Sequence, residues 1–341
     1  MRYTKIVLVS IFLLSAFILG IFLGNKIEKK DIIRSLIELE HESYERYSIE
    51  NLKNFQKTGT LEIGDLVNEF ENFNSYTFSF TFEPDPASSE LKTTTGLINI
   101  PKEKSHYPLV LMLRGYVNQE TFKSGDGTRN VSYKLAENGF ITIAPDFLGY
   151  GESDPEAGNI FETRFQTYTT VLSIINYLEK NINIKLGNEN WKLENIFLWS
   201  HSNGGHIAIT TLEITGKNYP TTLWAPVSKP FPYSVLYYTD QSEDGGVLIR
   251  SELSKFESAN NPDSFSLTNN LENIKAPLQI QQGEDDEAVP KSWSDEIVSK
   301  LKSAKIDVTY NIYPLTDHNM NPSWREAVES DLEFFRKHID N

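Results

Sequence analysis

The stretch Leu198–His206 reads LWSHSNGGH and joins an apolar run to a second apolar stretch. The first run is typical of a buried strand and the second of a helix, so the stretch predicts a sharp strand-to-helix turn. At such a turn only small residues fit two positions before and after the central one, because strand and helix approach closely. Ser200 and Gly204 meet this requirement around Ser202. The pattern indicates that Ser202 is a nucleophile, although a turn without chemistry also fits this stretch taken alone.

A serine hydroxyl is a weak nucleophile and needs a base, which an acid in turn orients. His318 lies in YPLTDHNMNP, a loop between the last expected strand and the final helix, where an imidazole can reach the nucleophile. Asp286 lies in GEDDEAVP after another strand, and the spacing G-x-x-D-x-x-V-P selects it from four consecutive acids. The alternative is that these acids form only a solvated turn. The other histidines lie in the N-terminal segment, in a loop, beside the turn and in the last helix: His41, His106, His201, His206 and His338.

Strands and helices alternate along the chain, which predicts an α/β fold with a largely parallel sheet and helices on both faces. The expected strands lie at residues 76–82, 91–100, 108–113, 140–147, 195–200, 221–226, 277–282 and 308–314. The first two are expected to form an antiparallel hairpin. Helices are expected around 161–175, over 203–216, and at the C-terminus, with Asn321 as cap and Pro322 in the first turn.

Four segments, in this order, resemble the α/β-hydrolase superfamily: LMLRGY, APDFLGYGESD, LWSHSNGG, and GEDDEAVP with the His318 loop. The prolyl-oligopeptidase-like branch of serine peptidases, with its esterase relatives, is the most similar. The resemblance covers nearly the whole of residues 71–341 and implies the α/β-hydrolase fold. It implies a serine hydrolase that cleaves ester or peptide bonds through Ser202, His318 and Asp286 and an acyl-enzyme. No metal or organic cofactor is required for that chemistry.

Two backbone N–H groups are expected to stabilise the oxyanion of the tetrahedral intermediate. Asn203 supplies one because it begins a helix. The resemblance implies that Tyr116 supplies the other through its backbone, with its hydroxyl as the alternative. Arg114 departs from the family, because many members have histidine at this position. Residues 229–270 lie where the fold commonly inserts a short lid, and the aromatic cluster Phe231, Tyr233, Tyr237 and Tyr238 lines the substrate pocket or packs the lid against the body.

The N-terminus carries a hydrophobic segment, Ile6–Gly24, whose 19 residues contain no charge. As a helix it would span about 28 Å, close to the thickness of a bilayer core. Because no A-x-A-like cleavage site lies near Gly24, residues 1–30 are interpreted as a membrane anchor with the catalytic domain outside the cytoplasm. The alternative is a cleaved signal peptide and a secreted protein. Residues 31–70 are expected to form a helical stalk, and residues 71–341 the catalytic domain.

The composition narrows the function further. The formal net charge of −15 disfavours nucleic acid as a partner. Without cysteine, the chain has no disulfide, no thiolate nucleophile and no thiolate metal site. Residues 31–75 are too few for the β-propeller that restricts entry in many prolyl-oligopeptidase-like enzymes, which favours a free-standing hydrolase. The remaining candidates are a peptidase acting on short peptides, a carboxylesterase acting on small acyl esters, and a non-catalytic binding protein with a hydrolase fold.

Overall fold

A computed structural model describes residues 43–102, 106–181, 183–186, 189–242 and 244–339. Residues Tyr44–Ile249 and Asn261–Asn341 form one compact unit, and a second unit groups Met1–Ser43 with Arg250–Asn260. The first unit carries the sheet and the candidate site. The expected membrane anchor over residues 1–30 and the start of the expected stalk lie outside the described residues. Within the described part of the chain, no helix has both the length and the apolarity to cross a membrane.

The first unit is built around one sheet with the strand order β1-β2-β3-β5-β4-β7-β8-β9-β10, and β6 pairs with β7. The strands from β5 to β10 along this order run parallel, whereas β1, β2 and β3 are antiparallel. The ten strands are β1 (Gly59–Glu69), β2 (Phe73–Phe82), β3 (Lys92–Pro101), β4 (His106–Leu113), β5 (Ile141–Pro145), β6 (Asn183–Leu186), β7 (Glu189–His201), β8 (Thr221–Trp224), β9 (Leu278–Gly283) and β10 (Val308–Tyr313).

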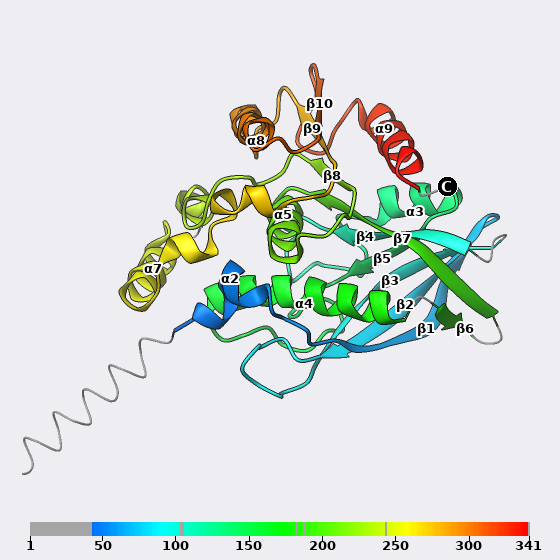
Figure 1. Cartoon of the computed structure of the whole chain (residues 1–341), viewed down its shortest axis with the longest axis horizontal. Coiled ribbons are helices and arrows are strands. Elements are labelled where there is room, and N and C mark those ends of the chain that lie inside the picture. Colours follow the sequence, from blue (N-terminus) through cyan, green and yellow to red (C-terminus); the bar gives the residue numbers. More distant parts are fainter. Residues whose placement is uncertain (1–42, 103–105, 182, 187–188, 243, 340–341) are drawn as a thin grey trace, which may run out of the picture. The chain divides into compact units, whose positions relative to one another are not determined.

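Helices cover both faces of the sheet, as Figure 1 shows. Helices α3 (Arg129–Glu137) and α9 (Trp324–Lys337) pack on one face, and α4 (Ile160–Lys180) and α5 (Asn203–Thr215) on the other. The remaining helical elements are η1 (Glu45–Tyr47), α2 (Ile49–Leu52), α6 (Tyr233–Leu236), η2 (Thr239–Gln241), α7 (Val247–Ala259), η3 (Pro262–Phe265), η4 (Leu267–Asn269), η5 (Leu271–Asn273) and α8 (Lys291–Ser303). The expected mostly parallel sheet between helices is confirmed, and so is the β2–β3 hairpin.

Two local predictions are wrong. The described part of the expected helical stalk contains only η1 and α2, and residues Gly59–Glu69 form strand β1 instead. Leu61 is the one buried residue of this edge strand. The strand therefore contributes little to the core, and its backbone pairing with β2 decides its structure. The terminal helix begins at Trp324 after Ser323, not at Pro322. Asn321 donates its backbone N–H to Asp317 Oδ1 (2.8 Å), so it closes a loop turn and does not cap the helix.

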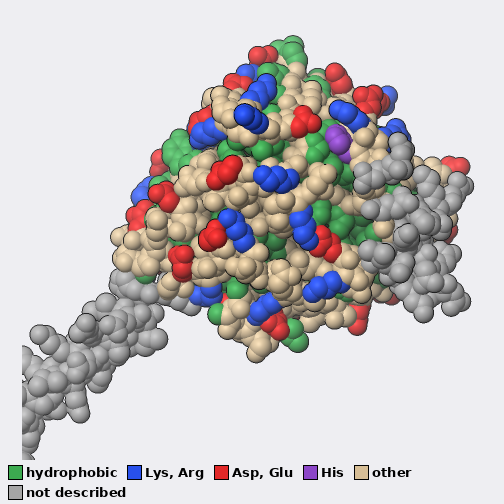
Figure 2. Space-filling model, viewed as in Figure 1, with side chains coloured by type: hydrophobic (Ala, Val, Ile, Leu, Met, Phe, Trp, Pro, Cys, Tyr) green, Lys and Arg blue, Asp and Glu red, His purple; other side chains and the backbone are tan. Residues whose placement is uncertain are grey.

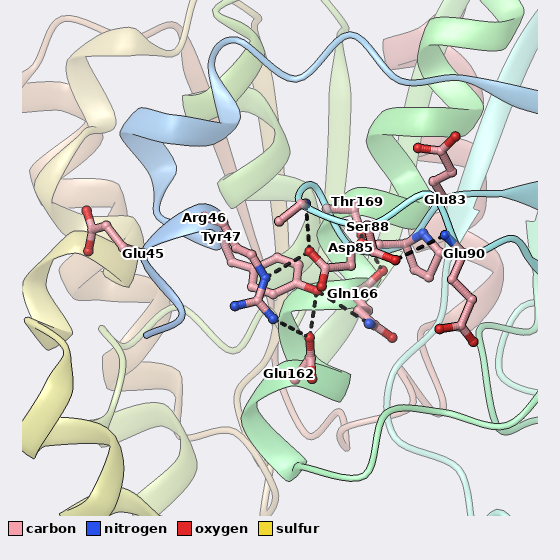
Figure 3. Close-up of polar contacts among 12 residues, drawn as sticks. Glu45, Arg46, Tyr47, Glu83, Asp85, Ser88, Glu90, Glu162, Gln166 and Thr169 are labelled. Carbon is pink, nitrogen blue, oxygen red and sulfur yellow. Dashed lines mark hydrogen bonds and ion pairs between the residues drawn. The ribbon is translucent and has the colours of Figure 1, made fainter. Parts of the chain in front are cut away.

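A polar network holds the first described residues against helix α4 (Figure 3). Arg46 forms ion pairs with Asp85 and Glu162, each at 2.8 Å. The Tyr47 hydroxyl donates to Glu162 Oε1 (2.9 Å) and accepts a hydrogen bond from Gln166 Nε2 (3.4 Å). These charge-assisted contacts fix the N-terminal half of α4, which borders the candidate site.

Helix α9 is joined to the sheet by a buried carboxylate. Asp331 Oδ2 accepts hydrogen bonds from the indole N–H groups of Trp199 (3.0 Å) and Trp224 (2.9 Å), and Oδ1 accepts from the amides of Gln279 and Gln281. Burial raises the pKa of Asp331 to about 7, although these hydrogen bonds oppose the shift. Asp331 thus ties α9 to three adjacent strands, β7, β8 and β9.

Replacing Asp331 with alanine should destabilise the fold by about 4 kcal/mol, since it leaves several buried donors without an acceptor. Urea unfolding followed by circular dichroism measures this change in the free energy of unfolding. Glu333→Ala, which removes an exposed carboxylate from the same helix, is the control and should change it by less than about 0.5 kcal/mol. An equal, small effect of both substitutions would contradict the role assigned to Asp331.

Candidate active site

Ser202 occupies a strained turn between β7 and α5. Its backbone has φ 56° and ψ −120°, a conformation that costs a non-glycine residue roughly 1–3 kcal/mol. Neighbouring backbone groups hold this geometry, because Ser202 N–H donates to Trp224 O and Ser202 O accepts from Gly205 and Val227, each at 2.9 Å. The turn is therefore fixed from β8 and from the segment that follows it.

Close packing around Ser202 explains the small residues beside it. A Cβ added at Gly204 would lie 2.0 Å from the carbonyl oxygen of Leu113, which no side chain tolerates. A Cβ at Gly115 would lie 2.9 Å from Ser202 Cβ. Ser200 is fully buried on β7. The requirement for small residues inferred from the sequence thus arises from contact between the start of α5 and the end of β4.

The structure brings Asp286 and His318 together from two loops. His318 Nδ1 lies 2.9 Å from Asp286 Oδ2, and the Asp286 side chain is fully buried. Asp286 Oδ1 also accepts the backbone N–H groups of Ala288 and Val289. Burial would raise the pKa of Asp286, but the hydrogen bonds from His318, Val289 and Ala288 outweigh it and hold this pKa below its usual value. The neighbouring Asp285 is exposed, so the geometry selects Asp286 from the acidic run.

Ser202 and His318 line one cavity of about 840 Å³, together with Asn203 and Tyr116. Among the hydrogen bonds of the described residues, none joins Ser202 to His318, a common feature of unliganded active sites, where such bonds tighten only with substrate. Asn203 is the first residue of α5, so its N–H has no partner within the helix. The Tyr116 side chain is 78% exposed. Of the aromatic cluster expected in the lid, only Tyr238 lines this cavity; the others are Phe231, Tyr233 and Tyr237.

Arg114 stands where many members of the resembled family have histidine, and neighbouring protein groups hold its guanidinium in place. Nη1 donates to Gly115 O (3.0 Å), and Nη2 donates to Asp146 O (2.7 Å). The guanidinium carbon lies 3.9 Å from the ring centroid of Tyr150 and 5.0 Å from that of Phe122. Burial lowers the pKa of Arg114. Arg114 therefore supports the loop that carries Tyr116 by hydrogen bonding and cation–π contacts.

His201 has a role that the sequence did not reveal. Its Nε2–H donates to the backbone oxygen of His318 (2.9 Å), and the two rings lie 4.6 Å apart. Desolvation, followed by the proximity of His318, lowers the pKa of His201 to about 4, so this ring is neutral at pH 7. A charged ring would repel an imidazolium at His318. The neutral donor instead connects the Ser202 turn directly to the His318 loop.

No group of three or more histidine and acidic side chains in the described ranges is arranged to hold a metal ion.

A family model described as chlorophyllase matches residues 68–219, less than half of the chain. Dipeptidyl aminopeptidase BIII of Pseudoxanthomonas mexicana is 23% identical over 270 residues, which cover 73% of this chain and 37% of that protein. An uncharacterized 31.7 kDa protein from the traX-finO intergenic region of Escherichia coli is 32% identical over 114 residues, 32% of this chain and 34% of that protein. The chain thus spans about a third of the length of the curated relatives it matches.

Solved structures of esterases and peptidases share the fold. An acetyl xylan esterase from Paenibacillus sp. R4 superposes with a TM-score of 0.59 at 16% identity, covering 84% of this chain and 91% of that one. The acylaminoacyl peptidase of Pyrococcus horikoshii gives a TM-score of 0.53 at 16% identity, over 79% of this chain and 42% of that one. Est1E from Butyrivibrio proteoclasticus, with ferulic acid bound, gives a TM-score of 0.51 at 18% identity, covering 73% of this chain and 96% of that one. These matches confirm the expected α/β-hydrolase fold.

His201→Phe keeps a ring of similar size but removes the donor to the His318 carbonyl. We expect the amide of Met320, which bonds to Asp317 O in this loop, to lose about fivefold in protection from hydrogen exchange, because a hydrogen bond worth about 1 kcal/mol is gone. His201→Gln, which retains an N–H donor, should keep most of the protection. Unchanged protection in the phenylalanine variant would show that the loop holds its place without His201.

Proposed function

We propose that this chain of the α/β-hydrolase superfamily is a serine hydrolase that cleaves carboxylic esters through an acyl-enzyme on Ser202. The observation that carries the proposal is the Asp286–His318 pair at 2.9 Å, whose histidine shares a cavity with a serine on a strained strand-to-helix turn. A non-catalytic protein has no need to bury a carboxylate against a histidine beside such a serine. The arrangement fits nucleophilic catalysis by a serine, a histidine and an acid.

Each residue has one task in the proposed reaction. Ser202 Oγ attacks the ester carbonyl while His318 Nε2 takes its proton, and Asp286 stabilises the imidazolium through Nδ1–H. The N–H of Asn203 and a second donor from Tyr116 bind the oxyanion, each worth roughly 3 kcal/mol of transition-state stabilisation. His318 then gives the proton to the leaving alcohol. In the second half of the reaction, His318 activates water, which attacks the acyl-enzyme and releases the acid.

A peptidase is the second candidate, and the match to dipeptidyl aminopeptidase BIII over 73% of the chain favours it. A free peptide amino terminus carries a positive charge and needs a carboxylate in the pocket. The lining of the cavity contains one carboxylate, Glu156, and two arginines, Arg114 and Arg164. This excess of positive charge disfavours a cationic substrate and supports an ester.

Ser202→Ala should abolish hydrolysis of p-nitrophenyl acetate, and a fluorophosphonate probe should label the wild-type chain at Ser202, as peptide mass spectrometry can verify. Asp286→Asn should lower kcat/KM by roughly 10⁴-fold, because the imidazole loses its orienting acid. Asp285→Asn is the matched control and should change kcat/KM less than about threefold, because Asp285 is exposed and makes no contact with His318. A folded wild-type chain that neither reacts with the probe nor hydrolyses the ester would support the binding-protein alternative.

A further inference from the structure

Neither of the two arginines that line the candidate active site, Arg114 and Arg164, forms an ion pair with a carboxylate of the described residues, and Arg164 has fewer hydrogen bonds than Arg114. Arg164, on helix α4, lines the same cavity as Ser202. Its Nη1 donates to Asn203 Oδ1 over a long 3.3 Å, while Nε and Nη2 are enclosed and have no hydrogen-bond partner. No carboxylate among the described residues forms an ion pair with Arg164. A guanidinium removed from water without a carboxylate is costly, so arginines in such places are normally paired.

The acidic residues around Arg164 form no ion pair with it. Glu162, two residues earlier on α4, binds Arg46 and Tyr47 (Figure 3). Asp286 is hydrogen-bonded to His318. Glu156 lines the cavity but does not pair with Arg164, and burial raises the pKa of Glu156. Because the chain has 47 acidic residues against 32 basic ones, a shortage of acids does not explain an unpaired arginine.

Arg114, the other arginine of the cavity, differs from Arg164. Two backbone carbonyls accept from its Nη1 and Nη2, aromatic rings enclose it, and only its Nε lacks a hydrogen-bond partner. Arg164 makes one hydrogen bond, a long one to the neutral side chain of the residue that follows Ser202, and its charge also acts on the hydroxyl of Tyr168. The guanidinium of Arg164 therefore contacts Asn203, the residue that follows Ser202 at the start of α5. Arg164 itself stands on α4, the helix that the Arg46 network holds in place.

We propose that Arg164 binds an anionic group of the substrate, so that this protein hydrolyses esters that carry a free carboxylate. The inference rests on the proposed serine hydrolase activity and narrows its substrate class. A carboxylate in the cavity offers this positive charge the counter-ion that no described carboxylate supplies, in a charge-assisted contact. The cost of desolvating Arg164 is incurred when the chain folds, and the bound anion recovers it.

The alternative role for Arg164 is support of the oxyanion through Asn203. The two roles differ in what they recognise: an oxyanion forms on every ester, whereas a substrate carboxylate is present on some. Matched esters that differ only in a carboxylate therefore separate them. One suitable pair differs on the leaving-group side, 4-acetoxybenzoate and 4-acetoxybenzamide. The other differs on the acyl side, p-nitrophenyl hemiglutarate and p-nitrophenyl pentanoate.

The experiment compares the full wild-type chain with Arg164→Met, Arg164→Lys and Arg336→Met. The wild type should prefer the carboxylate member of at least one pair by about ten- to a hundredfold in kcat/KM, as a charge-assisted hydrogen bond of roughly 1.5–3 kcal/mol gives. Arg164→Met should lose this preference, chiefly through KM, and Arg164→Lys should keep part of it. Arg336→Met, which removes an exposed arginine bound to Asn138, should keep it fully.

Two results would overturn the proposal: a wild type without preference in either pair, or an Arg164→Met variant that slows both members of a pair equally through kcat. Calorimetric binding of 4-acetoxybenzoate to the Ser202→Ala chain, with and without Arg164→Met, tests the same contact without turnover. If the affinity for 4-acetoxybenzoate is the same with and without Arg164→Met, the proposed role of Arg164 is wrong, even if Ser202 is labelled and neutral esters are hydrolysed. If binding of 4-acetoxybenzoate depends on Arg164 but the wild-type chain hydrolyses no ester, the proposed hydrolase activity is wrong and the proposed anion-binding role of Arg164 stands.

Discussion

The approach of helix α5 to the end of strand β4 is the constraint on which the candidate active site depends. At Gly204 the two backbones leave no space for a Cβ, which would lie 2.0 Å from Leu113 O. The same contact sets the strained conformation of Ser202 and aims the start of α5 at the cavity. A larger residue at Gly204 would push the helix away, and both the serine hydroxyl and the Asn203 N–H would move together.

Parallel strands bring the remaining parts of the site to the same edge. Ser202 follows β7, Asp286 follows β9 and His318 follows β10, and the carboxyl ends of parallel strands lie side by side. Loops that meet at one edge of a sheet still need direct contacts that hold their side chains within hydrogen-bonding distance of one another. The hydrogen bond from His201 to the His318 backbone supplies such a link between the first and last of these segments.

Asp331 and Arg164 show how differently this fold treats two charges removed from solvent. Asp331 collects hydrogen bonds from two indoles and two amides, so its carboxylate is satisfied and joins α9 to the sheet. Arg164 is left with one long hydrogen bond, to the residue that follows Ser202. On the face seen in Figure 2, acidic and basic side chains are interspersed, as expected of ordinary surface charges. A charge without a counter-ion in the cavity that Ser202 and His318 line is different, and the proposed substrate carboxylate would supply its partner.

The sequence by itself determined the alternating strands and helices, the Ser202 turn, and the choice of Asp286 and His318 as partners, because small-residue spacing and apolar runs act locally and in chain order. It did not determine strand β1 or the start of α9, where local patterns are weak and pairing with β2 or a turn at Asp317 decides. Nor did it indicate His201 as a link or Arg164 as an unpaired cation. Whether a histidine or an arginine has a partner depends on groups more than 100 residues away in the sequence, such as the backbone oxygen of His318 for His201 and the carboxylate of Glu162 for Arg46. Only the tertiary structure brings such groups within hydrogen-bonding distance, or leaves one of them without a partner.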